Sequence, residues 1–161
     1  MGQLTGEFEC KLDAKGRMVL PAALKRQLPE VETEGLVVNR GFEKHLVFYT
    51  KSEWAKITAR LSKLNRYKAK NRQFIRTFTR GHTELSLDAA GRVLFPKSLL
   101  EYAGIDAEVV LLCQFDQIEI WAKEAYVKLW EDEADEDFAL LAEEVMGGMD
   151  HDDDDVNPNE R

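Results

Sequence analysis

Short runs of β-branched and aromatic residues recur in two separate regions of the chain and predict strands. In the first region the runs are residues 35–40 (GLVVNR) and 45–50 (HLVFYT). In the second they are residues 108–115 (EVVLLCQF) and 117–122 (QIEIWA). Each pair of runs follows a strand, a Gly-Arg turn and a second short strand that ends near a proline. We therefore expect two regions with the same order of strands.

Helical patterns lie between and after these strands. Residues 22–28 (AALKRQL) and 97–104 (KSLLEYAG) each begin just after a proline, which suits the first turn of a helix. Thr50 and Glu53 have capping-box spacing and predict the start of a longer helix. The apolar residues of that helix recur on one face: Trp54, Ile57, Leu61 and Leu64.

A further helix, ending at Gly81, is expected next to it. Its apolar side would carry Tyr67, Phe74 and Phe78, and its opposite side basic residues: Lys68, Arg72, Arg76 and Arg80. Residues 51–80 contain ten Lys and Arg against one acidic residue. This basic surface either contacts a polyanion or is a solvated face, and the sequence leaves both interpretations open.

The C-terminal part of the chain combines an apolar stripe with many acidic residues. The stripe predicts a C-terminal helix and consists of Tyr126, Trp130, Phe138, Leu141 and Val145. From Gly147 the sequence GGMDHDDDDVNPNER is too polar to pack on a core, so we expect residues 147–161 to form a disordered acidic tail. Consecutive aspartates in such a tail provide no fixed cage for a metal ion.

The strongest feature of the sequence is an internal repeat. Residues 12–24 (LDAKGRMVLPAAL) and 87–99 (LDAAGRVLFPKSL) are 75 residues apart and share seven identities in thirteen positions. The similarity extends to residues 41–54 and 114–126 if His45 is treated as an insertion. Phe42 then matches Phe115 and the following acidic residues, Glu43 and Asp116, also match. The chain is predicted to consist of two duplicated halves.

Charge is distributed unevenly along the 161 residues. The net charge is −8, but residues 1–100 carry a balance of +9 and residues 101–161 a balance of −17. The acidic total therefore does not exclude a polyanionic partner for the first hundred residues. No apolar run is long enough to span a bilayer. The spacing of Cys10 and Cys113 fits no metal or redox motif, and reduced cysteines in a cytoplasmic protein are expected.

The repeated motif has a specific chemistry. An Asp can accept backbone N–H groups from the next residues, and a Gly three positions later can adopt positive φ, so Asp13 with Gly16 and Asp88 with Gly91 predict tight turns. Each turn would project the arginine that follows, Arg17 or Arg92. This arginine either forms only an ion pair with the aspartate or presents its planar guanidinium to phosphates or guanine edges.

The paired Asp-x-x-x-Arg motifs, one in each half, resemble the MraZ family of bacterial transcriptional regulators, within the AbrB-like (SpoVT-AbrB) DNA-binding superfamily. The resemblance covers approximately Gly2 to Met146. It implies a mainly β fold with helices, in which two AbrB-like halves exchange β-hairpins to form a double-split β-barrel. It also implies a homo-oligomeric ring that binds direct repeats in double-stranded DNA. These repeats would lie upstream of the division and cell wall gene cluster, including the regulator's own gene.

The resulting domain boundaries follow the pattern of the chain. We expect SpoVT-AbrB domains at residues 7–54 and 83–126, a basic helical connector at 55–82 and a C-terminal helix at 127–146, before the acidic tail. The expected DNA-contacting residues are Arg17, Lys15 and Arg92. Lys15 has Ala90 as its counterpart, so the first turn carries one more positive charge than the second and should contribute more to binding.

The functional prediction is a sequence-specific DNA-binding regulator of transcription, cytoplasmic and associated with the nucleoid. We expect no catalytic site, cofactor or metal, because the three histidines are scattered and no nucleophile motif or phosphate-binding glycine loop is present. The alternative is an AbrB-like antitoxin or protein-interaction module, in which the acidic tail masks a partner. The internal duplication argues against an antitoxin, since such proteins usually carry one motif and dimerise.

Overall fold

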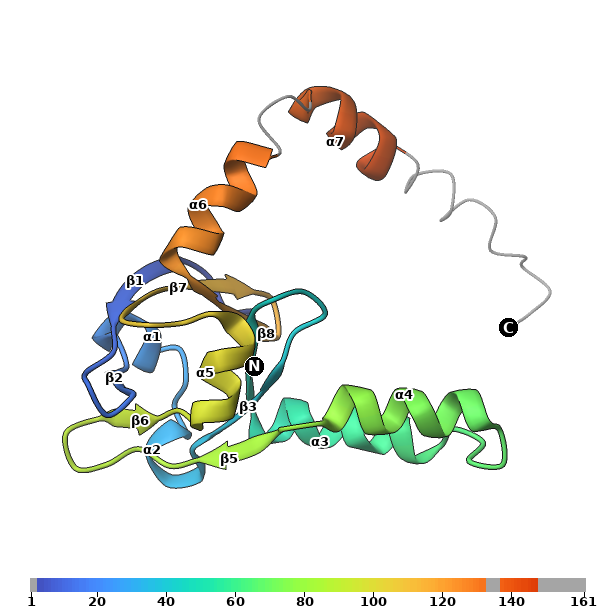
Figure 1. Cartoon of the computed structure of the whole chain (residues 1–161), viewed down its shortest axis with the longest axis horizontal. Coiled ribbons are helices and arrows are strands. Elements are labelled where there is room, and N and C mark those ends of the chain that lie inside the picture. Colours follow the sequence, from blue (N-terminus) through green and yellow to red (C-terminus); the bar gives the residue numbers. More distant parts are fainter. Residues whose placement is uncertain (1–2, 133–136, 148–161) are drawn as a thin grey trace. The chain divides into compact units, whose positions relative to one another are not determined.

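The computed structural model describes residues 3–132 and 137–147 (Figure 1). The chain divides into two units, Met1–Tyr126 and Val127–Arg161, and each is described by itself. Strands β1 to β8 all belong to the first unit. None of the helices in the described ranges is both long and apolar enough to cross a membrane.

Six strands form an antiparallel sheet in the order β1-β7-β8-β4-β3-β5. Their bounds are β1 Glu7–Lys11, β3 Leu36–Arg40, β4 Leu46–Thr50, β5 Thr83–Leu85, β7 Glu108–Gln114 and β8 Gln117–Ala122. The other two strands, β2 (Arg17–Val19) and β6 (Arg92–Leu94), pair antiparallel in a separate ribbon. The predicted class, mainly β with helices, is confirmed, while closure into a split barrel stays a prediction.

The two halves of the chain exchange strands. β1 of the first half pairs with β7 of the second, with Glu7 opposite Leu112. β5 of the second half pairs with β3 of the first, with Leu85 opposite Leu36. The central pairs, β4 with β8 and β2 with β6, also join one strand from each half. The corresponding strands are β1 and β5, β3 and β7, and β4 and β8. Interchanging them gives the same sheet order read from the other edge, so the halves are related by a pseudo-twofold axis.

The main hydrophobic core lies on one face of the sheet and includes the ribbon. Alternation along β3 places Leu36 and Val38 in this core, while Val37 points to the opposite face. Met18 of β2 and Val93 of β6 contribute fully buried side chains. A second cluster on the opposite face consists of Val37, Val47, Tyr49 and Trp54.

Three short helices each bury at least one side chain in the main core. α5 (Lys97–Ala103) begins after Pro96 and ends at Gly104, whose φ is +64°, as the sequence predicts. α1 (Ala22–Lys25) is shorter than the expected helix 22–28. After Lys25 the chain tightens into hydrogen bonds that span three residues, in which the N–H groups of Gln27 and Leu28 donate to the carbonyl oxygens of Leu24 and Lys25. Leu28 itself is disfavoured in helical conformation because it precedes Pro29. α2 (Val31–Glu34) follows and was not predicted.

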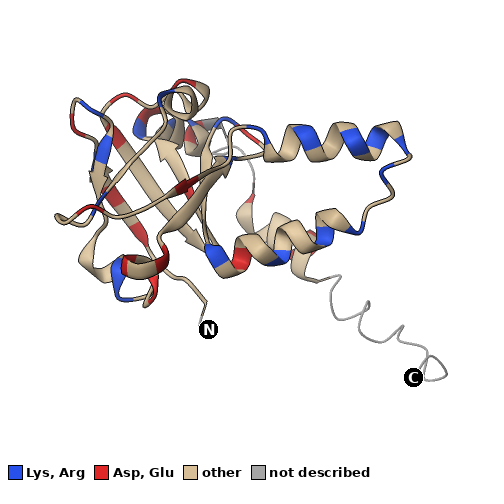
Figure 2. Cartoon of the chain, turned by 90° about the horizontal axis from the view of Figure 1, so that it is seen from below, with Lys and Arg blue, Asp and Glu red and all other residues tan. Residues whose placement is uncertain are grey.

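The helical pair between the halves projects from the sheet (Figures 1 and 2). α3 (Lys51–Ser62) begins as expected at Thr50, whose Oγ1 accepts the N–H of Glu53 at 3.2 Å. α4 (Ala69–Thr79) carries Lys70, Arg72 and Arg76, and basic residues coloured blue lie along both helices of the pair in Figure 2. Tyr67 does not lie on its apolar face as predicted. It precedes the helix, in a turn closed by the Asn65 side chain, and its side chain is 96% exposed.

The C-terminal region contains two helical segments. α6 (Lys123–Asp132) begins in the first unit, and α7 (Phe138–Met146) belongs to the second. Asp137 caps α7, because its Oδ1 accepts the N–H of Ala139 at 3.0 Å. Residues 133–136, within the predicted C-terminal helix, and residues 148–161 of the predicted tail lie outside the described residues.

Candidate nucleic-acid interface

The first Asp-x-x-x-Arg segment is a tight turn closed by Asp13. Its Oδ1 accepts the backbone N–H of Lys15 at 2.9 Å and that of Arg17 at 3.0 Å. The Asp13 carbonyl oxygen accepts the N–H of Gly16 at 3.0 Å. Gly16 has a φ of +85°, a conformation that residues with a side chain rarely adopt, which explains the glycine.

The second turn repeats this geometry. Oδ1 of Asp88 accepts the N–H groups of Ala90 and Arg92, both at 2.9 Å, and Gly91 has a φ of +75°. The arginines bind their aspartates in the same way. Arg17 Nε donates to Asp13 Oδ2 at 2.7 Å, and Arg92 Nε donates to Asp88 Oδ2 at 2.8 Å. The predicted turns and the predicted ion pair are therefore both present in each half.

The turns are joined by the β2–β6 ribbon, which fixes them relative to each other. Met18 lies opposite Val93 at the centre of the ribbon, and both side chains are fully buried in the core. The Gly16 carbonyl oxygen accepts the N–H of Phe95 at 3.0 Å, and that of Gly91 accepts the N–H of Leu20 at 3.1 Å. Each turn is thus bonded to the other half.

The outer face of the ribbon carries both arginines. Arg17 lies opposite Leu94 and Arg92 opposite Val19, so strand alternation places these four side chains on the face away from the core. The arginine side chains are 30% and 32% exposed. Of the three guanidinium nitrogens of each arginine, only Nε is bonded to the aspartate. The two terminal nitrogens have no hydrogen-bond partner in the part of the chain that the structure describes. These terminal nitrogens form the planar fork that binds phosphate or guanine.

The electrostatics favour charged arginine–aspartate pairs at neutral pH. The backbone N–H of Arg17 is the main cause that lowers the pKa of the Asp13 carboxyl, and the Arg17 side chain lowers it further. The backbone N–H and side chain of Arg92 have the same effect on the pKa of Asp88. Both carboxylates stay ionised well below neutral pH and hold the guanidinium groups in place.

The structure adds one basic residue that sequence reasoning missed. Lys25 Nζ, on α1, lies 3.9 Å from the position that a Cβ at Gly91 would take. At Gly16 the pseudo-equivalent neighbour is Leu100 on α5, whose Cδ1 lies 3.3 Å from the position that a Cβ at Gly16 would take. The second turn therefore has a lysine from the other half beside it, but Lys25 Nζ forms an ion pair with the Glu32 carboxylate. The repeat alignment pairs Lys25 with Leu100, but the sequence gives no sign that either residue approaches the opposite turn.

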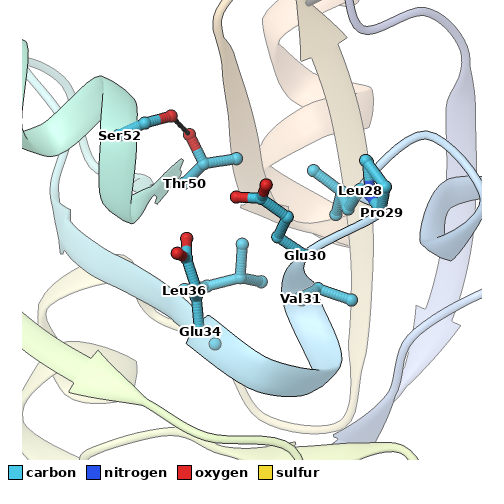
Figure 3. Close-up of a pocket in the computed structure, with 9 residues that line it drawn as sticks. Leu28, Pro29, Glu30, Val31, Glu34, Leu36, Thr50 and Ser52 are labelled. Atoms are coloured by element: carbon cyan, nitrogen blue, oxygen red, sulfur yellow. Dashed lines mark hydrogen bonds between the residues drawn. The ribbon is translucent and has the colours of Figure 1, made fainter.

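Other features of the first unit carry less chemistry. The apolar pocket between α2 and the start of α3 has a volume of about 20 Å³, close to that of one water molecule (Figure 3). Among the described residues, no three His, Cys, Asp or Glu side chains gather to hold a metal ion. Cys10 and Cys113 are free, as expected, and burial raises the pKa of Cys10 to about 11.

Comparison with known proteins agrees with the duplicated architecture. The sequence model of a family described as "MraZ protein, putative antitoxin-like" matches the chain twice, over residues 3–77 and 78–147. The chain belongs to the MraZ family. Each of the two matches contains one of the turns described above, so the resemblance carried by the paired motifs is confirmed.

Curated relatives give the MraZ family its functional class. The chain is 46% identical to the transcriptional regulator MraZ of Christiangramia forsetii over 153 residues, which is 94% of this chain and 98% of the relative. It is 42% identical to that of Flavobacterium psychrophilum, over 94% of this chain and 97% of the relative. It is 40% identical to the transcriptional regulator MraZ of Cytophaga hutchinsonii, over 91% of this chain and 96% of the relative. The predicted class, a transcriptional regulator, is that of this family.

Proposed function

We propose that the protein is a sequence-specific DNA-binding transcriptional regulator whose β2–β6 ribbon contacts double-stranded DNA. Membership in the MraZ family supports the functional class. The observation that carries the DNA contact is the pair of arginines, Arg17 and Arg92, held on one exposed face with their terminal nitrogens unpartnered in the described residues. A two-stranded ribbon is narrow enough to enter the major groove.

The rigid base of each arginine favours binding. Arg17 Nε and its backbone N–H are bonded to Asp13, so the side chain loses little conformational freedom when it meets DNA. Lys15 on the first turn adds positive charge for phosphate contacts, whereas the charge of Lys25 beside the second turn is paired with Glu32. The first turn therefore keeps the larger net positive charge, and Arg17 is expected to contribute more than Arg92.

The larger assembly follows from the resemblance. The protein acts as a homo-oligomer, in a ring, on direct repeats upstream of the division and cell wall genes and of its own gene. Several copies would then engage several repeats at once, which raises the overall affinity. The motif-bearing domains are residues 7–54 and 83–126, joined by the connector 55–82. Such a regulator works in the cytoplasm, at the nucleoid.

The deciding experiment measures operator affinity at two salt concentrations. The probe is the DNA immediately upstream of the protein's own gene. Arg17→Ala is expected to lose specific binding, because a lost base contact costs about 1–3 kcal/mol and the loss recurs in every bound copy. Each lost phosphate contact lowers the salt slope by about 0.9. Arg92→Ala should weaken binding less.

The control for this experiment is Lys128→Ala, on α6, which removes one positive charge outside the ribbon. It should bind like the unaltered protein. If Arg17 serves only as the partner of Asp13, then Arg17→Ala and Asp13→Ala lower the melting temperature in parallel while folded Arg17→Ala still binds. That result would contradict the proposed DNA contact.

A second candidate function is that of an antitoxin, which the description of the matching family favours. An antitoxin of this kind would hold a small basic partner through the acidic C-terminal region. Purification from the native host separates the two functions. A stoichiometric small basic protein that co-purifies supports the antitoxin, whereas co-purified promoter DNA without such a partner supports the regulator.

A further inference from the structure

Two exposed phenylalanines lie at corresponding turns of the pseudo-symmetric fold. Phe42, in the β3–β4 turn, is 85% exposed, and Phe115, in the β7–β8 turn, is 68% exposed. Phe115 has a φ of +61° and is the one non-glycine residue with positive φ in the described ranges. Its carbonyl oxygen accepts the N–H of Leu4 at 2.8 Å, which holds the turn in place. A strained backbone that presents a large apolar side chain to solvent indicates a contact.

The surroundings of Phe42 form a pocket that can receive an aromatic ring. The pocket has a volume of about 300 Å³ and is lined mainly by aromatic and arginine side chains: Phe42, Phe74, Phe78, Tyr102, Arg40 and Arg80. The Phe78 ring centroid lies 6.0 Å from that of Phe42 and 5.7 Å from that of Phe74. An inserted ring would find tilted and edge contacts with these neighbours.

The pocket also carries positive charge without enough acidic partners. Arg40 stacks over the Tyr102 ring at 4.7 Å, and its Nε is buried with no hydrogen-bond partner. Lys44 Nζ lies over the same ring at 4.5 Å, and Arg80 lines the opening. None of the residues that line the pocket is acidic, and Glu43 in the adjoining turn is the residue that matches Asp116 in the second half. An aromatic side chain accompanied by a carboxylate would complement this pocket.

The surroundings of Phe115 have the opposite character. Asp116 follows it directly, and Glu53 lines the same surface. At the position equivalent to Tyr102 this surface has Gln27, whose side chain is bonded to the Thr5 backbone at 2.9 Å in both directions. The two pseudo-equivalent surfaces therefore differ. The surface around Phe42 is an aromatic and basic pocket, and the surface around Phe115 is an exposed turn with acidic residues. Two different complementary surfaces on one chain produce head-to-tail contacts between copies.

We propose that the Phe115–Asp116 turn of one copy docks into the Phe42 pocket of a second copy. Phe115 fills the space between Phe42, Phe74 and Tyr102, and the Asp116 carboxylate pairs with the cations at the opening. This contact specifies the interface of the oligomer and so rests on the proposed function. A second copy suits the pocket better than duplex DNA, whose stacked bases would have to be flipped out of the double helix to enter it. None of the lining residues belongs to the β2–β6 ribbon.

The test measures the mass of the full chain by light scattering, together with operator binding. Phe115→Gly removes the ring and suits a φ of +61°, so the chain should fold and its mass should fall towards the 18.5 kDa of one chain. Phe42→Ala should have the same effect from the pocket side. Tyr67→Ser, which alters another exposed aromatic residue outside both surfaces, should keep the mass of the unaltered protein.

A charge exchange identifies the partners directly. Asp116→Lys and Arg80→Glu should each reduce the assembled fraction, and the double variant should restore it. If Phe115→Gly keeps the full mass, this contact is wrong while the oligomer stands. If the unaltered protein is itself a monomer, the oligomer of the proposed function fails as well. If Arg80→Glu loses operator affinity at unchanged mass, the pocket binds DNA and the proposal is overturned.

Discussion

The two motif glycines have matching backbones but different surroundings. A Cβ at Gly16 would lie 3.3 Å from Leu100 Cδ1, whereas a Cβ at Gly91 would meet only Lys25 Nζ, at the ordinary contact distance of 3.9 Å. Both substitutions to alanine introduce strain of about 1–2 kcal/mol from positive φ. We expect Gly16→Ala to lower the melting temperature by roughly 2–8 °C, and Gly91→Ala to lower it less. Thermal unfolding of the two variants checks this order, and an equal effect would contradict it.

The motif aspartates predict a defined pH dependence. Their folded-state pKa lies below the usual 3.8, so their contribution to stability is present above pH 3.8 and is lost as the pH falls through the lowered value. The melting temperature of the protein should therefore exceed that of Asp13→Asn/Asp88→Asn by a constant amount between pH 7 and pH 5. The difference should vanish in stronger acid. A difference that already declines between pH 7 and pH 5 would indicate another titrating group.

Individual residues show where sequence reasoning reaches its limit. The turns at Asp13 and Asp88 were predictable, because the aspartate, glycine and arginine act within five consecutive residues. The approach of Lys25 to Gly91 was not, because it joins the two halves through the fold. His45 looks like an insertion in the repeat, yet its ring is buried and stacks on Trp121 at 4.4 Å. Local patterns do not reveal such contacts between distant strands.

Among the elements, the helical pair depends on one aromatic anchor. Trp54 is only 9% exposed, and its ring stacks on Phe78 at 6.1 Å and on His82 at 5.3 Å. We expect Trp54→Ala to cost about 3–5 kcal/mol, which lowers the melting temperature by roughly 6–20 °C. Amide hydrogen exchange should accelerate in residues 51–80 more than in the β2–β6 ribbon. Uniform acceleration across the chain would show that the pair is not a separate unit.

The matched control is Tyr67→Ala, in the turn between the two helices. Tyr67 is 96% exposed, so this change removes an aromatic ring without loss of buried surface. Its melting temperature should stay close to that of the unaltered protein. A large decrease would mean that the far end of the pair is covered by another molecule, and the decrease would then depend on protein concentration.

Elements with clear end signals were predicted best. α5 lies between Pro96 and Gly104, and α3 begins at the Thr50 cap, so both starts agree with the sequence. α1 ends at Lys25, earlier than the expected residue 28, and the prediction took no account of Pro29. The strands were predictable from composition, but their pairing partners were not. Exchange between halves was expected only from the resemblance, since alternation says nothing about which strand lies beside which.

For the molecule as a whole, the uneven charge gives a further prediction. Residues 147–161 contain six acidic residues, Asp150, Asp152–Asp155 and Glu160, and few apolar ones. Their deletion removes little apolar surface, so we expect a nearly unchanged melting temperature. Operator binding should tighten at low salt, because like charges near DNA are removed, and the gain should disappear at high salt. A marked decrease in the melting temperature would contradict the prediction that residues 147–161 form a disordered tail.

The exchange of strands also determines when each half can fold during protein synthesis. Glu7 pairs with Leu112, so β1 has no partner until β7 has left the ribosome. At about 5–20 residues per second, the first strand waits for roughly 5–20 s. β5 emerges after β3 and finds its partner already made. The two halves are symmetric in the folded protein but fold at different times, because β1 of the first half stays unpaired and exposed until the second half is translated.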